Sequence, residues 1–285
     1  MGFNSNGTKL LLYAKSKGVD FGKTITIGRQ GLHLDESTLR DNFDESGIKG
    51  ADAATLLRQE KGYAEPFLKA LGAKEVHSLD ASDYESATIV HDMNQPIPEK
   101  YKAAYDVVID GGSLEHIFNF PVAIRNCMEM VKVGGHFMGL TPCNNFFGHG
   151  FYQFSPELYF RIFSKENGFE MKTVIFYNDK KNSGWYEVKD PNEVKSRVTL
   201  SSGSPSYLFV MAKKISAENI FSKTPQQSDY QNILWDVKNN ENPIQLNQRS
   251  VSITSKVSNM LSHFFSFFSE TGTGNKNFFK KIQSK

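Results

Sequence analysis

Short apolar segments that end in glycine or acidic residues alternate with helical segments over the first 210 or so residues. The clearest is Tyr105–Asp110, a continuous apolar run between turn signals, which is typical of a parallel strand buried on both faces. The full set predicts seven strands, at 23–28, 74–80, 87–92, 105–110, 134–140, 171–177 and 206–212. This alternation predicts an α/β fold with one open, mostly parallel sheet.

Helical patterns fill the stretches between these strands. Apolar residues recur at helical spacing in 6–17 and 63–71, and a longer helix is expected over 113–131. Ser155 followed by Pro156 predicts a helix start, and Gly168 predicts its end. Helices are therefore expected on both faces of the sheet.

The composition excludes several classes of protein. With 33 basic and 31 acidic residues, no broad basic face is implied, so nucleic acid is not an expected partner. Two cysteines cannot build a disulfide framework, which suggests a reducing compartment. The chain has no apolar run of the ~18 residues that a membrane span needs, so it is expected to be cytoplasmic. The histidines have no defensible ligand spacing and CxxC is absent, so no metal site is predicted.

The composition changes after Lys213, where Ser, Asn and Gln become frequent. We therefore divide the chain into an α/β domain over 1–213, a polar linker over 214–250, and an amphipathic helix with a mobile tail over 251–285. Apolar residues between Val251 and Phe268 share one helical face. This C-terminal helical extension could dock on the domain, form a homodimer contact or lie on a membrane. Its polar face of Ser, Thr and Asn favours docking or dimerisation.

Three predicted strands end in, or at, an acidic residue: Asp80, Asp92 and Asp110. The carboxyl ends of parallel strands form the edge of the sheet where ligands bind. A carboxylate there can accept hydrogen bonds from both hydroxyls of a ribose. Strand-end aspartates also occur simply as solvated turn formers, but three at successive strand ends favour a binding site.

Over residues 20–212 the sequence resembles the class I S-adenosylmethionine-dependent methyltransferases, which have a Rossmann-like fold. The segments that carry the resemblance are HSLDAS, IVHDMNQPIP, YDVVIDGGSLEHI and VKVGGHFMGLTP. It implies S-adenosylmethionine as cofactor, with Asp80 binding the ribose and Asp92 and Met93 beside the adenine. It also implies that Asp110 and Gly111 line the methionine end.

The glycine loop of that family, D-x-G-x-G-x-G, is altered here. Gly28 remains, but Thr26 replaces the acid, and Gln30 and Leu32 replace the second and third glycines. Two interpretations follow. Either Arg29 or Gln30 replaces the lost contacts, with Arg29 able to clamp a carboxylate, or the site has decayed. We favour the first because the acids and paired glycines are retained.

The resemblance implies that the methyl acceptor binds beyond the predicted fourth and fifth strands. Methyl transfer to a hydroxyl requires removal of a proton, and the candidate bases are His149, His116 and Glu115. Tyr152, Glu115 and Asn144 are expected to contact the substrate. A histidine in either place is also common as a structural hydrogen-bonding group.

The resemblance is closest to methyltransferase-like proteins of bacterial surface-polysaccharide clusters, through the segments GRQ and HGFYQFSPE. It implies a small-molecule acceptor such as a sugar or sugar nucleotide. Three hypotheses remain: an active methyltransferase, a non-catalytic methyltransferase-like scaffold, and another Rossmann-like nucleotide enzyme. The absence of a G-x-G-x-x-G fingerprint after the first predicted strand weakens the third.

Overall fold

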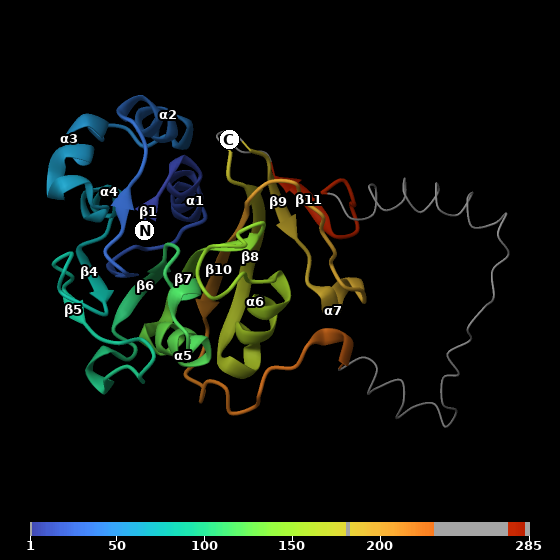
Figure 1. Cartoon of the computed structure of the whole chain (residues 1–285). Helices are drawn as coiled ribbons and strands as arrows, with labels where there is room; N and C mark the ends of the chain where they lie inside the picture. The colour runs from blue at the N-terminus through green and yellow to red at the C-terminus, as the bar shows by residue number, and fades with distance from the viewer. Residues whose placement is uncertain (1, 181–182, 231–272, 283–285) are drawn as a thin grey trace, which may run out of the picture.

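A nine-stranded sheet lies at the centre of the fold, between the helices (Figure 1). Its strand order is β11-β9-β8-β10-β7-β6-β2-β4-β5. The computed structural model describes residues 2–180, 183–230 and 273–282. The strands are β2 (Lys23–Ile27), β4 (Glu75–Asp80), β5 (Ile89–Val90), β6 (Tyr105–Asp110), β7 (Val131–Asn144), β8 (Phe169–Asn178), β9 (Trp185–Val188), β10 (Ser206–Lys214) and β11 (Phe279–Ile282). A mostly parallel α/β sheet is thus confirmed.

The order of the strands reverses between β2 and β6. The chain passes from β2 outward to β4 and β5, then returns to β6 and β7, and each neighbouring pair among these five is parallel. Strand β10 is antiparallel to both β7 and β8. In open α/β sheets, ligands bind beyond the carboxyl ends of the strands at such a reversal. The fold therefore points to the edge beyond β2 and β6.

The prediction of seven strands is wrong for the described residues, because two short strands extend the sheet beyond β8. Strand β9 pairs with β8, and β11 pairs with β9, both antiparallel. Each has only four residues, and two of the four in β11 are lysines, so neither shows the apolar run by which a strand is recognised. Residues 279–282, expected in a mobile tail, form β11. The predicted helix at 251–268 lies outside the described residues.

Helices cover both faces of the sheet. They are α1 (Ser5–Ser16), α2 (Glu36–Ser46), α3 (Ala53–Arg58), α4 (Glu65–Ala70), α5 (Phe120–Met130), α6 (Pro156–Ile162) and α7 (Pro191–Val194), with 3-10 turns η1 (Gln59–Gly62), η2 (Glu99–Tyr101), η3 (Leu114–His116) and η4 (Lys165–Asn167). None of the helices in the described part of the chain is long and apolar enough to cross a membrane.

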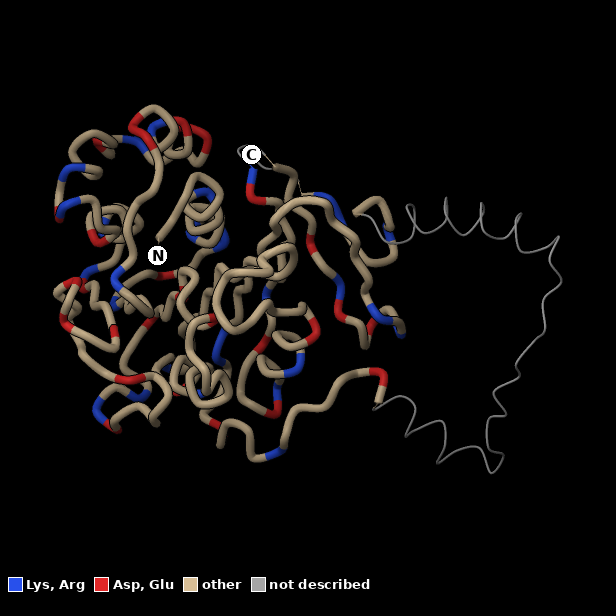
Figure 2. The backbone as a smooth tube through the Cα atoms, viewed as in Figure 1, with Lys and Arg blue, Asp and Glu red and all other residues tan. Residues whose placement is uncertain are grey.

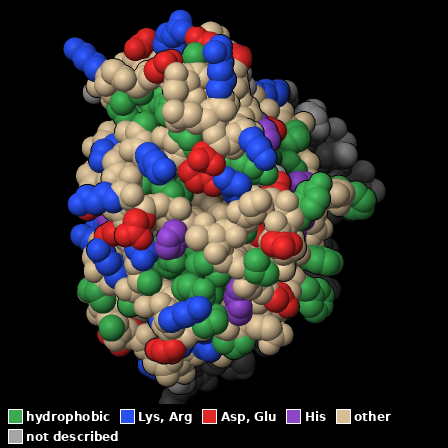
Figure 3. All heavy atoms as spheres, turned by 90° about the vertical axis from the view of Figure 1, so that its left-hand side faces the viewer, with side chains coloured by type: hydrophobic (Ala, Val, Ile, Leu, Met, Phe, Trp, Pro, Cys, Tyr) green, Lys and Arg blue, Asp and Glu red, His purple; other side chains and the backbone are tan. Residues whose placement is uncertain are grey.

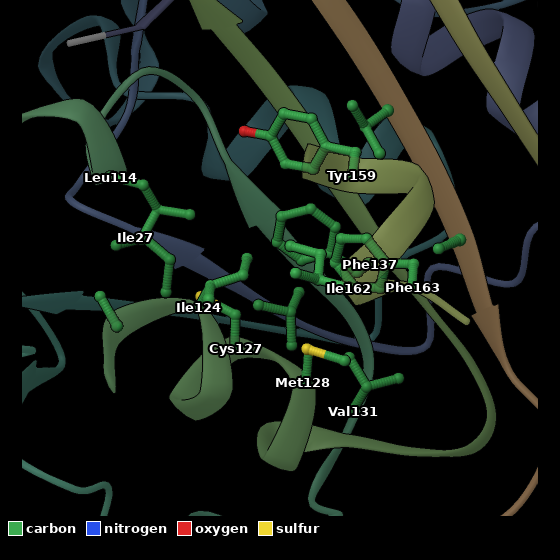
Figure 4. Packing of buried hydrophobic residues seen from close by; sticks show 14 of the residues in the cluster. Ile27, Leu114, Ile124, Cys127, Met128, Val131, Phe137, Tyr159, Ile162 and Phe163 are labelled. Carbon is green, nitrogen blue, oxygen red and sulfur yellow. The ribbon is translucent and has the colours of Figure 1, made fainter. Parts of the chain in front are cut away.

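The two faces have separate apolar cores, because successive strand side chains point to opposite sides. Val107 and Ile109 pack with α1, α2 and α4, whereas Val108 packs with α5 and α6. Figure 4 shows the second core, where side chains from α5 and α6 meet those of the sheet. Burial of each such side chain contributes roughly 1.5–3 kcal/mol, which fixes β6 and therefore the loop that follows it.

The helix predicted over 113–131 is broken. Residues 114–116 form η3, and α5 begins only at Phe120, with Pro121 in its first turn. Proline has no N–H to donate and restricts the residue before it, so a helix starts there more readily than it passes through. The break leaves η3 as a separate turn at the carboxyl edge of the sheet.

An N-terminal arm crosses the same region. Strand β1 (Gly2–Phe3) pairs in parallel with β3 (Gly31–Leu32). A Cβ atom at Gly2 would collide with the carbonyl oxygen of Gly31, so only glycine allows this approach. The arm brings the start of α1 beside the loops that follow β2 and β6.

Candidate functional site

A cavity of about 260 Å³ opens at the carboxyl edge of the sheet. Its walls come from the N-terminal arm, the loop after β6, the end of β7, the following loop, and the facing ends of β8 and β10. The lining residues are Gly2, Asn4, Gly7, Gly111, Gly112, Glu115, His116, Leu140, His149, Tyr177 and Tyr207. Four predicted site residues, Gly111, Glu115, His116 and His149, therefore meet in one place.

Glu115 is the most enclosed polar group of this cavity, with a residue exposure of 1%. Its backbone oxygen accepts hydrogen bonds from the amides of Phe151 (2.7 Å) and Tyr152 (3.3 Å). These bonds hold the loop after β7 against η3. Its Oε1 atom lies 3.4 Å from His149 Nε2 and 4.0 Å from His116 Nε2. The fold thus joins one carboxyl and two imidazoles from separate loops.

The two histidines are open to solvent on one side. Their rings lie 4.8 Å apart, edge to face, and each side chain is a little under half exposed. His149 sits between Gly148 and Gly150, and its amide donates to the carbonyl of Phe146 (3.0 Å). This arrangement can accept a proton from a ligand in the cavity, or coordinate an ion.

Burial shifts the protonation of the cluster. It raises the pKa of Glu115 to about 7, because the charged carboxylate is poorly solvated there. Burial, followed by repulsion from His149, lowers the pKa of His116. Near neutral pH, Glu115 is therefore close to its own midpoint and can gain or lose a proton at small cost. A carboxyl poised in this way suits proton transfer.

The opposite wall contains two tyrosines that the sequence analysis did not select. The rings of Tyr177 and Tyr207 stack 5.6 Å apart, and burial raises the pKa of Tyr207 to about 12. Its hydroxyl is then protonated at neutral pH and can donate. Both tyrosines lie within predicted strands. They meet at this edge because β10 runs antiparallel to β8, so that the start of β10 lies beside the end of β8.

The three strand-end acids lie along the same edge with different surroundings. Asp80 is partly exposed and accepts one hydrogen bond, from the amide of Ser82 (3.2 Å). Asp92 is exposed and accepts from the amide and side chain of Asn94 (2.9 and 2.8 Å), and these bonds lower its pKa. Asp80 keeps free acceptor capacity, whereas Asp92 closes a local turn.

Asp110 differs from the other two because it is fully buried. Its Oδ1 accepts from the amides of Ser113 (2.8 Å) and Leu114 (3.2 Å), and burial, with the nearby Glu115, raises its pKa. The carboxyl therefore caps the turn after β6. The adjacent glycines, Gly111 and Gly112, line the cavity in its place.

The altered glycine loop after β2 has its own internal contacts. Gly28 has a φ of +71°, and its carbonyl accepts from the Thr26 hydroxyl (2.8 Å). The Arg29 guanidinium donates to Glu65 (2.6 Å) and to the carbonyl of Glu85 (3.0 Å), and it lies over the ring of Tyr63. Arg29 thus ties the loop after β2 to the start of α4 and to the segment after β4.

Gln30 fills the space between the loops after β2 and β6. Its residue exposure is 1%, and its Nε2 donates to the carbonyl of Ile27 (2.5 Å) and the hydroxyl of Ser113 (3.3 Å). A Cβ atom at Gly111 would lie 2.5 Å from Gln30 Oε1. That Oε1 has no hydrogen-bond partner among the described residues.

The remaining predicted residues lie around the site. Met93 is buried in the core, where Asn126 donates to its carbonyl (3.3 Å). The hydroxyl of Tyr152 donates to the carbonyl of Phe118 (2.6 Å), which anchors the loop. Asn144 accepts from the amide of Asn145 (3.0 Å) at the end of β7. Neither Tyr152 nor Asn144 lines the cavity.

The residues fit an adenosine-bearing cofactor at one end. Asp80 offers a partly exposed carboxylate toward the ribose. At the methionine end, Gly111 and Gly112 leave backbone accessible, but the side chain of Gln30 lies against Gly111, and its unpartnered oxygen is a polar group that a ligand or a changed rotamer would satisfy.

Charged side chains of both signs are interspersed along the backbone (Figure 2) and over the face shown in Figure 3, where no broad basic area is visible.

No family model matches the chain. It is 30% identical over 122 residues to the ubiquinone biosynthesis O-methyltransferase of Photorhabdus laumondii subsp. laumondii. The match covers 43% of this chain and 43% of that protein. The similarity thus spans less than half the length of the curated relative.

Solved structures are similar at low identity. A protein from Listeria monocytogenes, described as an S-adenosylmethionine-dependent methyltransferase, is 16% identical with a TM-score of 0.41, covering 74% of this chain and 97% of that one. The Burkholderia thailandensis 1,6-didemethyltoxoflavin-N1-methyltransferase, solved with S-adenosylhomocysteine, is 13% identical with a TM-score of 0.39, covering 74% and 78%. At these scores the likeness does not assign a function.

Proposed function

We propose that this chain is an S-adenosylmethionine-dependent methyltransferase that acts on an oxygen or nitrogen of a small polar acceptor. The observation that carries the proposal is the cluster of Glu115, His116 and His149 in a cavity beside Gly111 and Gly112. This cluster lies at the carboxyl edge, near the reversal of strand order, where ligands bind in such sheets. The partial match to an O-methyltransferase supports the same reaction class.

Each end of the cofactor has candidate partners. Asp80 accepts hydrogen bonds from the ribose hydroxyls, and Asp92 with Met93 lies toward the adenine. Gly28 and Gly111 lie along the methionine end, and Arg29 holds the loop between them through Glu65. The cofactor supplies a methyl group on a sulfonium centre; alignment and proton removal are the work of the protein.

His149 is the leading proton acceptor for a hydroxyl substrate. Its Nε2 faces the Glu115 carboxyl at 3.4 Å, so the carboxylate form of Glu115 stabilises an imidazolium on His149. His116 lies beside them and is kept mainly neutral, because burial lowers its pKa. A single proton can therefore be shared within the cluster during transfer.

The class of acceptor follows from the resemblance. A sugar or sugar nucleotide of a surface polysaccharide has the hydroxyl groups that this cluster would deprotonate. Such an enzyme would work in the cytoplasm, before export of the polysaccharide.

Calorimetry on the full chain tests the cofactor assignment. S-adenosylmethionine and S-adenosylhomocysteine are expected to bind and NAD is not. Asp80→Ala is expected to weaken binding at least tenfold, because the ribose hydroxyls lose their acceptor. Asp83→Ala, an exposed acid three residues further on, is the matched control and should bind as the wild type does. Unchanged affinity in Asp80→Ala would contradict the ribose assignment.

A non-catalytic binding or scaffold protein is the second candidate, favoured by the buried Gln30 side chain in the cofactor hollow. Under that hypothesis none of the three ligands binds. The same calorimetric series therefore separates the two functions.

A further inference from the structure

The cavity wall formed by Glu115, His116 and His149 brings together three side chains that ligate metals. One donor atom from each lies within 4.8 Å of the others. Two of the residues are neighbours in η3, and the third comes from the loop after β7, about 30 residues along the chain. No spacing in the sequence indicates this set, because the fold alone assembles it.

The distances between the donor atoms are similar to, or slightly longer than, those between the ligands of a bound metal ion. Nitrogen and oxygen ligands at ~2.0–2.2 Å from one ion lie roughly 3.0–3.5 Å from each other. Here Glu115 Oε1 lies 3.4 Å from His149 Nε2 and 4.0 Å from His116 Nε2. Both imidazoles are partly exposed, so small side-chain rotations toward Glu115 complete the geometry.

The Glu115 carboxyl that supplies this Oε1 atom also has unused acceptor capacity. The Oε2 atom of Glu115 is buried and has no hydrogen-bond partner among the described residues. A buried oxygen without a partner is destabilising. A cation bound between Glu115 and the two imidazoles would satisfy this carboxylate and offset the cost of its burial.

We propose that Glu115, His116 and His149 bind one divalent transition-metal ion, with Zn²⁺ as the best-matched ion. Two imidazole nitrogens and one carboxylate form a donor set that suits Zn²⁺, Co²⁺ or Fe²⁺ better than Mg²⁺ or Ca²⁺, which prefer oxygen ligands. Three protein ligands leave positions open toward the cavity. A hydroxyl bound there would have a lowered pKa. With the ion in place, His149 is a ligand rather than the proton acceptor, and the ion would activate the acceptor of the proposed reaction.

Metal binding is tested without any methyl donor, so it does not depend on the proposed function. The untagged full chain, freed of metal with a chelator, is titrated with Co²⁺ and followed by visible absorption and calorimetry. One equivalent of Co²⁺ is expected to bind, to give d–d bands typical of low coordination number, and to be displaced by Zn²⁺. Mg²⁺ at the same concentration is expected to leave the bands unchanged.

Variants assign the ligands. His149→Ala and His116→Ala are each expected to weaken Co²⁺ binding at least tenfold, and Glu115→Gln is expected to do the same. His91→Ala is the matched control and should bind Co²⁺ as the wild type does. His91 lies in the segment after β5, away from the three proposed ligands, and contacts the carbonyl of Gln95 there. Should Glu115→Gln fail to fold, the two partly exposed histidines still decide the assignment.

The proposal is overturned if the full chain binds no Co²⁺, or if the His149→Ala and His116→Ala variants bind it unchanged. A separate titration with S-adenosylmethionine, in the presence of chelator, reports on the cofactor. Loss of one binding activity with retention of the other shows which of the two proposals fails.

Discussion

At the scale of single residues, Gln30 decides whether the cofactor hollow is open. Its side chain lies against Gly111 and donates to the carbonyl of Ile27. Glycine in this position would leave the backbone free to approach a ligand. The hydrogen bonds of Gln30 stabilise the closed loop by roughly 0.5–1.5 kcal/mol each, and a ligand must exceed that amount to displace the side chain.

Gln30→Ala is therefore expected to tighten S-adenosylmethionine binding, by about threefold to tenfold, while lowering the free energy of unfolding by about 1–2 kcal/mol. Calorimetry and urea denaturation measure the two effects, and exposed Gln95→Ala serves as the control. Weaker binding in Gln30→Ala would instead mean that the carboxamide contacts the ligand.

Glu115 is expected to make stability depend on pH. Its folded-state pKa, about 7, is raised by burial above the usual 4.5. The folded protein therefore holds this proton more tightly than the unfolded chain does. The stability associated with the protonated form is fully present below pH ~4.5 and is lost as the pH rises through ~7, up to about 3 kcal/mol at 1.36 kcal/mol per pKa unit.

The difference between Glu115→Gln and wild type measures this effect. Because Gln cannot ionise, the unfolding free energy of the variant relative to wild type is expected to rise between pH 4.5 and pH 7.5. Urea denaturation of both proteins across that range, without metal, provides the values. Glu99→Gln, at an exposed position, should show no such trend, and a flat difference for Glu115→Gln would contradict the raised pKa.

At the scale of elements, sequence patterns located the main strands but not the breaks that shape the site. The apolar run of 105–110 predicts β6 as observed. The helical periodicity of 113–131 continues across Pro121, so it hides the separation of η3 from α5. That separation is what turns Glu115 inward, and its partner His149 could be joined to it only by the tertiary fold.

The N-terminal arm shows the same limit. Two residues, Gly2 and Phe3, pair with Gly31 and Leu32, and such a short strand has no periodicity to detect. Yet this pairing supplies one wall of the cavity and packs Phe3 beside Gly111. The strand ends bring Asp80, Asp92 and Asp110 to one edge of the sheet, but none of them lines the cavity, and the burial of Asp110 follows from the turn that it caps.

At the scale of the whole molecule, the sheet has a parallel part and an antiparallel part. The parallel strands are β5, β4, β2, β6 and β7, and the antiparallel part reaches from β10 and β8, which contribute Tyr207 and Tyr177 to the cavity, out to β9 and β11. The alternation of strands and helices predicts the first part. It does not predict β9 and β11, because their short polar-rich sequences gain their order from pairing with a preformed edge.

Phe279 is the residue of β11 that packs most closely against the rest of the sheet and is expected to stabilise it. It is 4% exposed and its ring lies 6.2 Å from that of Phe176 on β8. Replacement by alanine removes a buried aromatic side chain, so Phe279→Ala is expected to lower the free energy of unfolding by roughly 3 kcal/mol. Lys280→Ala, an exposed neighbour in the same strand, should change it by less than about 0.5 kcal/mol.

The affinity of Phe279→Ala for S-adenosylmethionine is expected to equal that of the wild type at a temperature where both are folded. The reason is topological, since β9, β8, β10 and β7 lie between β11 and the strands β6 and β2 that border the cofactor hollow. Denaturation and calorimetry on the same preparations compare the two quantities. A parallel loss of stability and affinity would show that the two parts of the sheet are energetically coupled, and that the C-terminal strand acts on the site through the antiparallel strands between them.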